Sequence, residues 1–153
     1  MKIQILQFSA TKNKLLSSLE AEFEKRLRPY FQLETLTLTA SKSDEREKAQ
    51  LEERDKMMAK LDTDAHIIAL DERGKLLTSP EFAEHILKER DFGSGKLQLL
   101  IGGSHGLHPE LLESAHFKLS LSKMTFTHEM LRVFLKEQLY RAAMILAGKP
   151  YHK

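Results

Sequence analysis

The sequence contains no cysteine among its 153 residues. This absence excludes disulfide bonds, zinc sites built from thiolates and cysteine nucleophiles. It also fits a reducing compartment, so we expect a cytoplasmic protein. No stretch approaches the roughly 20 consecutive apolar residues that a membrane-spanning helix needs. The alternating start, Met1-Lys2-Ile3-Gln4-Ile5, differs from the apolar segment of a secretory signal.

A strong excess of charge of one sign is also missing, because 24 Lys and Arg stand against 22 Asp and Glu, for a net charge of +2. So small an excess does not by itself indicate a nucleic-acid-binding protein. The distribution is uneven, since residues 118–153 carry a net charge of +5 and the rest of the chain carries −3. A basic carboxyl-terminal region would attract a polyanion, although a solvated helix face with ordinary lysines explains the same pattern.

The chain is long enough for one domain with a core and too short for two, at 153 residues and 41% hydrophobic content. Segments of strand and helix character alternate along it. The predicted strands are 2–8, 31–38, 66–70, 97–101 and 117–121, and the predicted helices are 15–27, 79–91, 109–115 and 127–147. This alternation predicts an α/β fold with a mostly parallel sheet and helices on both of its faces.

Residues 43–60 are rich in charge and poor in apolar side chains. Ser43, followed by acidic residues, is typical of the first turn of a helix. We expect an exposed helix or an ordinary loop here. The alternative is a mobile lid over a functional site.

The last predicted helix, 127–147, carries apolar residues around most of its circumference. Such a helix has to bury more than one face. A partner subunit in a homodimer would cover the second face, and burial within the chain's own core is the alternative.

Two predicted strands end in segments suited to ligand binding. The apolar run 99–101 stops at Gly102 and Gly103, and the run 117–121 ends at Ser122 in a similar way. In α/β folds, ligands bind beyond the carboxyl ends of the strands. Glycine also lets a ligand approach the backbone, because it has no Cβ. We therefore predict that the two segments together form a main-chain cup for a small molecule.

Several common sites do not match this region. The segment 102–106 lacks the lysine of a phosphate-binding loop and the glycine spacing of a dinucleotide-binding turn. Ser104 is not placed as in a nucleophile elbow. His105, His108 and His116 have no acidic ligand at regular spacing, so we expect no metal site.

Polar side chains gather around the last predicted helix. They are His128, Arg132, Glu137, Tyr140, Arg141, Tyr151 and His152. They are candidates for a polar functional site beside the glycine segment. They also fit ordinary surface chemistry, because Glu137 and Arg141 stand at the spacing of a helical ion pair.

Five stretches carry a family resemblance: Leu100–Leu107, Leu119–His128, Arg132, Glu137–Ala142 and Pro150–Lys153. In these stretches and in its overall length, the chain resembles the ribosomal large-subunit methyltransferase H family of the SPOUT methyltransferases. The resemblance implies an α/β domain with a carboxyl-terminal trefoil knot and a homodimer that builds the site. A knot could not be expected from periodicity, because knotted chains are rare.

The resemblance also implies the cofactor and the substrate. The cofactor is S-adenosylmethionine, and the substrate is a pseudouridine of large-subunit rRNA in the assembled ribosome, methylated at N3. The residues implied to hold the cofactor are Leu70, Gly102, Leu121, Ser122, Lys123, Met124, Thr125 and Phe126. The chain departs from the family pattern at Ser104-His105 and at Thr127, where proline is frequent, and we expect Thr127 to cap the last helix instead.

Roles for the remaining residues follow as hypotheses from the same resemblance. His128 or His152 would accept the N3 proton. Tyr151 would stack on or orient the base, and one way to do so is across the dimer interface. The residues expected to hold RNA phosphates are Arg132, Arg141 and Lys153. Two rival functions remain, a SPOUT enzyme acting on tRNA and a ribosome-binding dimer without catalytic activity.

Overall fold

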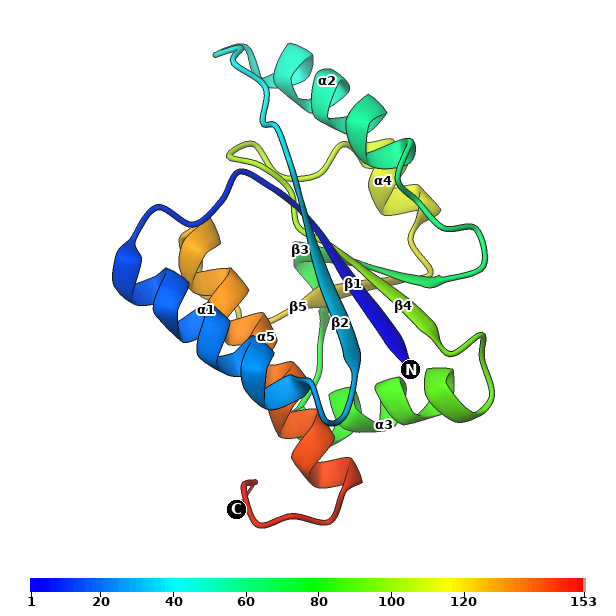
Figure 1. The fold of residues 1–153 in the computed structure, drawn as a ribbon. Coiled ribbons are helices and arrows are strands. Elements are labelled where there is room, and N and C mark those ends of the chain that lie inside the picture. Colours follow the sequence, from blue (N-terminus) through cyan, green and yellow to red (C-terminus); the bar gives the residue numbers. More distant parts are fainter. Residues whose placement is uncertain (153) are drawn as a thin grey trace.

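Five parallel strands form one sheet in the order β2-β1-β4-β3-β5. Figure 1 shows this sheet in the computed structural model, which describes residues 1–152. The strands are β1 (Lys2–Phe8), β2 (Gln32–Leu38), β3 (His66–Leu76), β4 (Lys96–Leu100) and β5 (Phe117–Ser120). The helices are α1 (Lys14–Leu27), α2 (Arg46–Met58), α3 (Ser79–Asp91), α4 (Pro109–Ser114) and α5 (His128–Leu146). The predicted mostly parallel sheet with flanking helices is confirmed.

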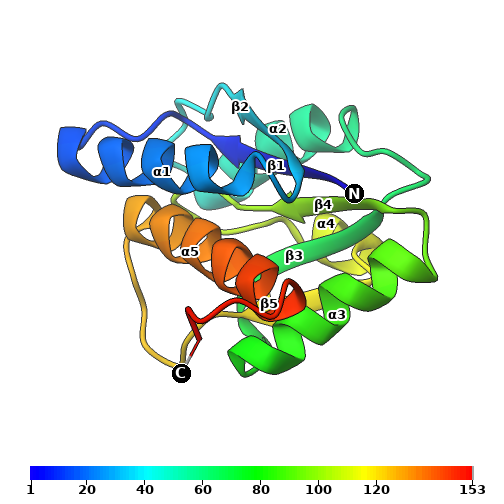
Figure 2. The same ribbon diagram turned by 60° about the horizontal axis from the view of Figure 1, so that its bottom comes forward.

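Helices cover both faces of the sheet. Figure 2 shows α1, α5 and α3 side by side on one face, with α5 between the other two. These helices share a core with one face of the strands, which includes Ile5, Leu99 and Leu139. A second core lies under α2 and α4 and includes Met57 and Leu111. Since α5 has helices on both sides, burial within its own chain covers much of its apolar circumference, and the homodimer stays a prediction.

β3 is longer than predicted. The sequence predicted that the strand ends at Leu70. The chain instead returns to the sheet, because Leu70 and Lys75 both pair with Leu119 of β5. The intervening residues bulge out of the ladder. The strand end was misjudged because a run of polar residues with a glycine looks like a turn in the sequence. The renewed pairing with β5 depends on the tertiary fold, which the local sequence does not show.

α2 begins later than predicted and is less exposed. Its N-cap is Glu45 rather than Ser43, whose hydroxyl accepts a hydrogen bond from the backbone N–H of Glu45 at 3.2 Å. The helix buries one stripe, formed by Ala49, Glu53 and Met57. The segment is therefore a docked helix, neither wholly exposed nor a loop.

α1 buries a different face from the one its leucines suggest. Leu15 and Leu19 are 78% and 47% exposed, whereas Glu20 and Leu27 are buried. The carboxylate of Glu20 turns inward because a lysine of α5, Lys136, pairs with it there. The predicted helix is present, and its predicted core face is only partly right.

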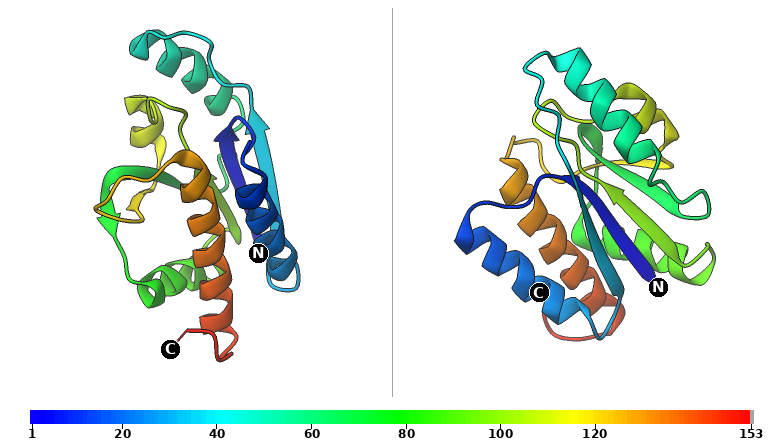
Figure 3. Two further views of the ribbon diagram at one scale, coloured as in Figure 1. Left: turned by 90° about the vertical axis from the view of Figure 1, so that its left-hand side faces the viewer. Right: turned by 45° about the horizontal axis from the view of Figure 1, so that its top comes forward.

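α2 and the carboxyl terminus lie at opposite ends of the molecule, as Figures 1 and 3 show. The residues between Leu121 and Thr127 connect β5 to the start of α5 at the carboxyl-terminal edge of the sheet. None of the helices within residues 1–152 combines the length and apolar character that a bilayer-spanning helix requires. The trefoil knot implied by the family resemblance stays a prediction.

Candidate functional site

A cavity of about 500 Å³ opens at the carboxyl-terminal edge of the sheet. Its walls come from the bulge in β3 and from the segments that follow β4 and β5, together with the first turns of α2 and α5. The lining residues include Leu70, Asp71, Glu72, Arg73, Ile101, Gly102, Ser104, His105, Gly106, Leu107, Leu121, Ser122, Met124, Thr125, Phe126 and His128. The two segments predicted to form a cup therefore do converge, and the space between them is open.

The loop after β4 is a tight turn that depends on glycine. A Cβ on Gly102 would lie 2.5 Å from the carbonyl carbon of Gly106 and 2.7 Å from the nitrogen of Leu107. Gly106 has a φ of +76°, which side chains rarely adopt. Its N–H donates to the carbonyl of Gly103 at 3.0 Å. Gly102 is thus required by the turn's own packing, a different reason from the ligand approach that the sequence suggested.

The loop after β5 supplies the opposite wall. The Ser120 hydroxyl donates to the carbonyl of Ser122 at 2.9 Å, and the Ser122 hydroxyl accepts from the backbone N–H of Met124 at 2.9 Å. The Phe126 ring packs edge-on against Phe134 of α5, with ring centroids 4.9 Å apart. These contacts fix the loop in a shape that faces the cavity.

Most of the residues implied as cofactor ligands border the cavity. Seven of the eight do so: Leu70, Gly102, Leu121, Ser122, Met124, Thr125 and Phe126. Lys123 is exposed and is not among the lining residues. Thr127 caps α5 as expected, because its hydroxyl accepts from the backbone N–H of Met130 at 3.3 Å.

The bulge in β3 adds residues that the sequence analysis missed. Asp71, Glu72 and Arg73 line the cavity from this bulge. Burial works against ionisation of Asp71, but hydrogen bonds from the Arg73 side chain and backbone outweigh it and hold the pKa of Asp71 below its usual value. The wall formed by this bulge therefore carries an ionised carboxylate. No local signal marks these residues, because only the return to β5 turns them toward the cavity.

His128 stands at the first position of α5 and borders the cavity. Burial of the ring among its neighbours lowers its pKa, and the positive charge of Arg132 adds to this effect. Glu53 works in the opposite direction. At neutral pH the imidazole is therefore uncharged and has one nitrogen free to accept a proton.

Arg132 is buried and turned away from the cavity. Its Nη2 donates to the carbonyl of Phe8 at 2.6 Å, and its Nη1 donates to the hydroxyl of Thr11 at 3.1 Å. Its Nε is buried without a hydrogen-bond partner in the described part of the chain. This guanidinium holds the end of β1 against α5, so the structure does not present it to an RNA phosphate.

Arg141, Tyr151 and His152 form a second group near the carboxyl end of α5. Glu137 Oε1 accepts hydrogen bonds from Arg141 Nη2 at 2.6 Å and from the Tyr151 hydroxyl at 3.2 Å. Arg141 Nη1 lies 3.4 Å from His152 Nδ1, and its guanidinium stacks over the Tyr151 ring. Lys153 lies outside the described residues.

The two groups are separated along one helix. Glu137 follows His128 by nine residues, which corresponds to about 14 Å along the helix axis. A second cavity of about 450 Å³ lies between them, bordered by Leu121 and Phe126 at one side and by Glu137 at the other. Within one chain, the predicted catalytic residues therefore do not meet at a single point.

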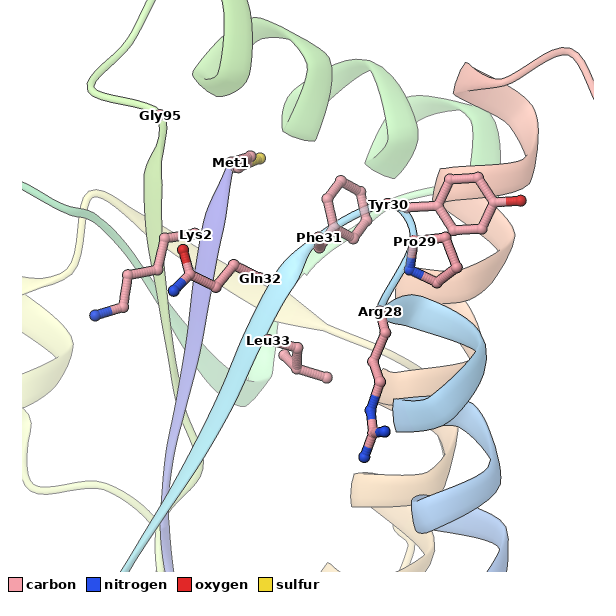
Figure 4. Close-up of a pocket in the computed structure, with 9 residues that line it drawn as sticks. All are labelled: Met1, Lys2, Arg28, Pro29, Tyr30, Phe31, Gln32, Leu33 and Gly95. Atoms are coloured by element: carbon pink, nitrogen blue, oxygen red, sulfur yellow. The ribbon is translucent and has the colours of Figure 1, made fainter.

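Neither the histidines nor the opposite edge of the sheet offers a competing site. In residues 1–152, no group of three or more His, Asp or Glu side chains is arranged to hold a metal ion. A shallow hollow at the amino-terminal edge is bordered by Lys2, Arg28 and Tyr30 (Figure 4). The Lys2 and Arg28 side chains point away from each other, so no set of polar groups converges there.

Comparison with known proteins identifies the family and the fold of the chain. A family model described as "Predicted SPOUT methyltransferase" matches residues 1–152. The chain is 40% identical to a ribosomal RNA large subunit methyltransferase H of Carboxydothermus hydrogenoformans and 39% identical to one of Bacillus pumilus, in both cases over the full length of both chains. A solved structure of a probable methylase family protein from Haemophilus influenzae covers 99% of this chain and 70% of its own, with a TM-score of 0.57 and 17% identity. That last similarity concerns the fold alone.

Proposed function

The chain belongs to the ribosomal RNA large subunit methyltransferase H family of the SPOUT methyltransferases, and from this premise we propose that it transfers a methyl group from S-adenosylmethionine to N3 of a pseudouridine in large-subunit rRNA. The substrate form we propose is the assembled ribosome. The observation that carries this proposal is the cavity at the carboxyl-terminal edge, where the bulge in β3 meets the segments after β4 and β5.

The residues of the cavity fit this cofactor. Its volume of about 500 Å³ suits a small molecule, and Leu70, Leu121 and Phe126 give apolar surface for an adenine ring. Asp71, held ionised by Arg73, gives a negative charge near a cationic ligand. When bound, S-adenosylmethionine supplies an electrophilic methyl group on a positively charged sulfur. We therefore assign its binding to the implied set Leu70, Gly102 and Leu121–Phe126, with Lys123 at the outer rim.

His128 is the proposed proton acceptor. Methylation at N3 of pseudouridine requires the proton on that nitrogen to leave, and a neutral imidazole at the cavity wall can take it. Its lowered pKa keeps it neutral at physiological pH. His152 is the second candidate for this role, through its Nε2, because its Nδ1 faces the donor Nη1 of Arg141.

A homodimer is the proposed way to complete the site. None of Arg141, Tyr151 and His152 borders the cavity of its own chain, because Arg141 and Tyr151 are held at Glu137. The apolar side chains of Leu15, Leu19, Met124 and Phe126 are exposed. In a dimer, a second copy of the carboxyl-terminal group would orient the base through Tyr151 and hold phosphates through Arg141 and Lys153. Arg132, being buried, would act only by positioning the start of α5.

The test is to incubate purified ribosomes, free rRNA and tRNA separately with cofactor labelled in its methyl group. We expect label in the large-subunit rRNA of ribosomes, recovered as N3-methylated pseudouridine after nucleoside analysis. Label in tRNA alone would overturn the proposal in favour of a tRNA enzyme. Absence of saturable cofactor binding in calorimetry would leave a ribosome-binding dimer without catalysis.

A further inference from the structure

α2 packs against the glycine loop 102–107. The loop lines the cavity, and α2 lies beside the loop together with α4 (Figure 1). Arg46 and Gln50 of α2 also border the cavity. Arg54 of α2 pairs with Glu110 of α4 at 2.8 Å, and Met57 shares the second core with Leu107. α2 has few apolar residues, yet it contacts both the loop 102–107 and α4, the helix that follows the loop.

Gln50 makes the central contact. Its Nε2 donates to the carbonyl of His105 at 2.9 Å and lies 3.4 Å from the carbonyl of Leu107. Neither carbonyl lies in a strand or a helix, because both residues stand between β4 and α4. Backbone carbonyls outside regular structure need a partner from a side chain or water, and one amide group provides it for both.

The peptide unit between His105 and Gly106 is therefore fixed on both of its polar sides. Its carbonyl accepts from Gln50, and its N–H, that of Gly106, donates to Gly103 at 3.0 Å. The left-handed φ of Gly106 gives this turn its direction. A peptide held at both ends cannot rotate without breaking one of these hydrogen bonds.

Glu53 supports the same loop one turn further along α2. Its side chain is buried. Its Oε2 lies 2.5 Å from the position that a Cβ on Gly103 would occupy. Glu53 Oε1 accepts from the backbone N–H of Ser41 at 3.1 Å. A buried carboxylate is costly unless it is paired or hydrogen-bonded. Two polar side chains of α2 thus hold the loop. Glu53 does so from outside the cavity, whereas Gln50 borders the cavity and donates its amide nitrogen to the loop carbonyls.

We propose that Gln50 is a positioning residue that sets the affinity for the methyl donor by holding the loop 102–107 in its binding shape. The inference rests on the proposed function, because it assumes that this loop contacts the cofactor. On this proposal, the charged segment around α2 stays in place and shapes the cavity, and it does not act as a moving lid.

The test compares Gln50→Met and Gln50→Glu with a matched control, Arg54→Met, on the next turn of the same helix. Gln50→Met keeps the side-chain length and removes the donor, and Gln50→Glu places a carboxylate against two carbonyl oxygens. Calorimetry with S-adenosylhomocysteine measures affinity. Hydrogen exchange of the segment 101–112 in the ligand-free protein measures how firmly the loop is held.

We expect Gln50→Met to bind S-adenosylhomocysteine about five- to tenfold more weakly, as the loss of one hydrogen bond implies, and Gln50→Glu to bind more weakly still. Exchange at Gly106 should quicken in both, while Arg54→Met stays within about twofold of the parent affinity, as expected for an exposed pair. With kinetics, the KM for cofactor should rise and kcat should stay unchanged.

Unchanged exchange at Gly106 in the Gln50 variants would overturn the proposal, because the loop would then be held by other contacts. Faster exchange without weaker binding would also overturn it. A parent protein that binds no S-adenosylhomocysteine would instead refute the proposed function, and the exchange measurement would still report whether Gln50 holds the loop.

Discussion

Lys136 of α5 and Glu20 of α1 form a buried ion pair, with 2.5 Å between Nζ and Oε2 and side chains that are 2% and 8% exposed. Lys136 also contacts Glu24 Oε1 at 2.7 Å. Glu20 accepts a further hydrogen bond from Thr11, whose hydroxyl accepts from Arg132. One polar network thus links α1, the end of β1 and the helix that begins at the cavity.

Lys136→Met should therefore destabilise the protein strongly. Removing one partner of a buried ion pair leaves the other charge without compensation, at a cost of about 3–5 kcal/mol. Urea unfolding of both proteins measures this difference. The double variant Lys136→Met with Glu20→Leu is the control. It should recover most of the loss, because the one carboxylate left without its partner, Glu24, is 38% exposed and reaches water. A single variant within about 1 kcal/mol of the parent would contradict the burial of this pair.

Gly102→Ala should abolish binding of S-adenosylhomocysteine in calorimetry. The added Cβ meets the backbone of Gly106 and Leu107 at 2.5–2.7 Å, so the turn has to open. The matched control is Gly95→Ala, at a φ of +71° near the amino end of β4. Its Cβ would meet no neighbour within 4 Å, so it should lower stability by about 1–2 kcal/mol through the left-handed φ alone and leave the affinity unchanged. Equal affinity in Gly102→Ala would remove this loop from the binding site.

The sheet and the meeting of its two loops could be predicted because both depend on simple rules. Alternating strands and helices give a parallel sheet, and parallel strands bring their carboxyl ends to one edge. The apolar run before Gly102 and the one before Ser122 were therefore enough to predict that the two loops meet at one cavity. Thr127 was predictable as a cap because capping is a local interaction.

The contacts that depend on tertiary pairing could not be predicted. Charged side chains are seldom buried, so nothing local marks Glu20 or Arg132 as interior residues. The bulge that brings Asp71 to the cavity is visible only through its pairing with β5. Gln50 stands in a segment of high charge, where its contact with a distant loop leaves no pattern.

The rate of methyl transfer should fall on the acid side of neutrality. Burial and the charge of Arg132 lower the pKa of His128, so protonation removes the acceptor only below the usual histidine value of about 6.5. With cofactor and ribosomes saturating, kcat should rise with pH and level off before pH 7. His128→Gln should lower kcat about 100-fold and remove this acid limb. If the fall of kcat at acid pH persists in His128→Gln and disappears in His152→Gln, the proton acceptor is His152.

The stability of the fold should also decline with acid, through a histidine pair remote from the cavity. His66 Nε2 lies 3.1 Å from His85 Nε2, and the His116 ring stacks on His66. Burial lowers the pKa of His66 and of His85, although Glu89, whose Oε1 is 3.4 Å from His66 Nδ1, works against this.

For both histidines, the unfolded chain therefore binds protons more readily than the folded one. Their contribution to stability is complete above about pH 6.5 and is lost as the pH falls toward their lowered folded values. Lys75 and Lys88 add to the effect at His85. The urea midpoint should fall between pH 7 and pH 5, and His85→Gln should reduce this slope because one of the two titrating groups is gone. An identical slope in the variant would show that carboxylates elsewhere cause the acid sensitivity.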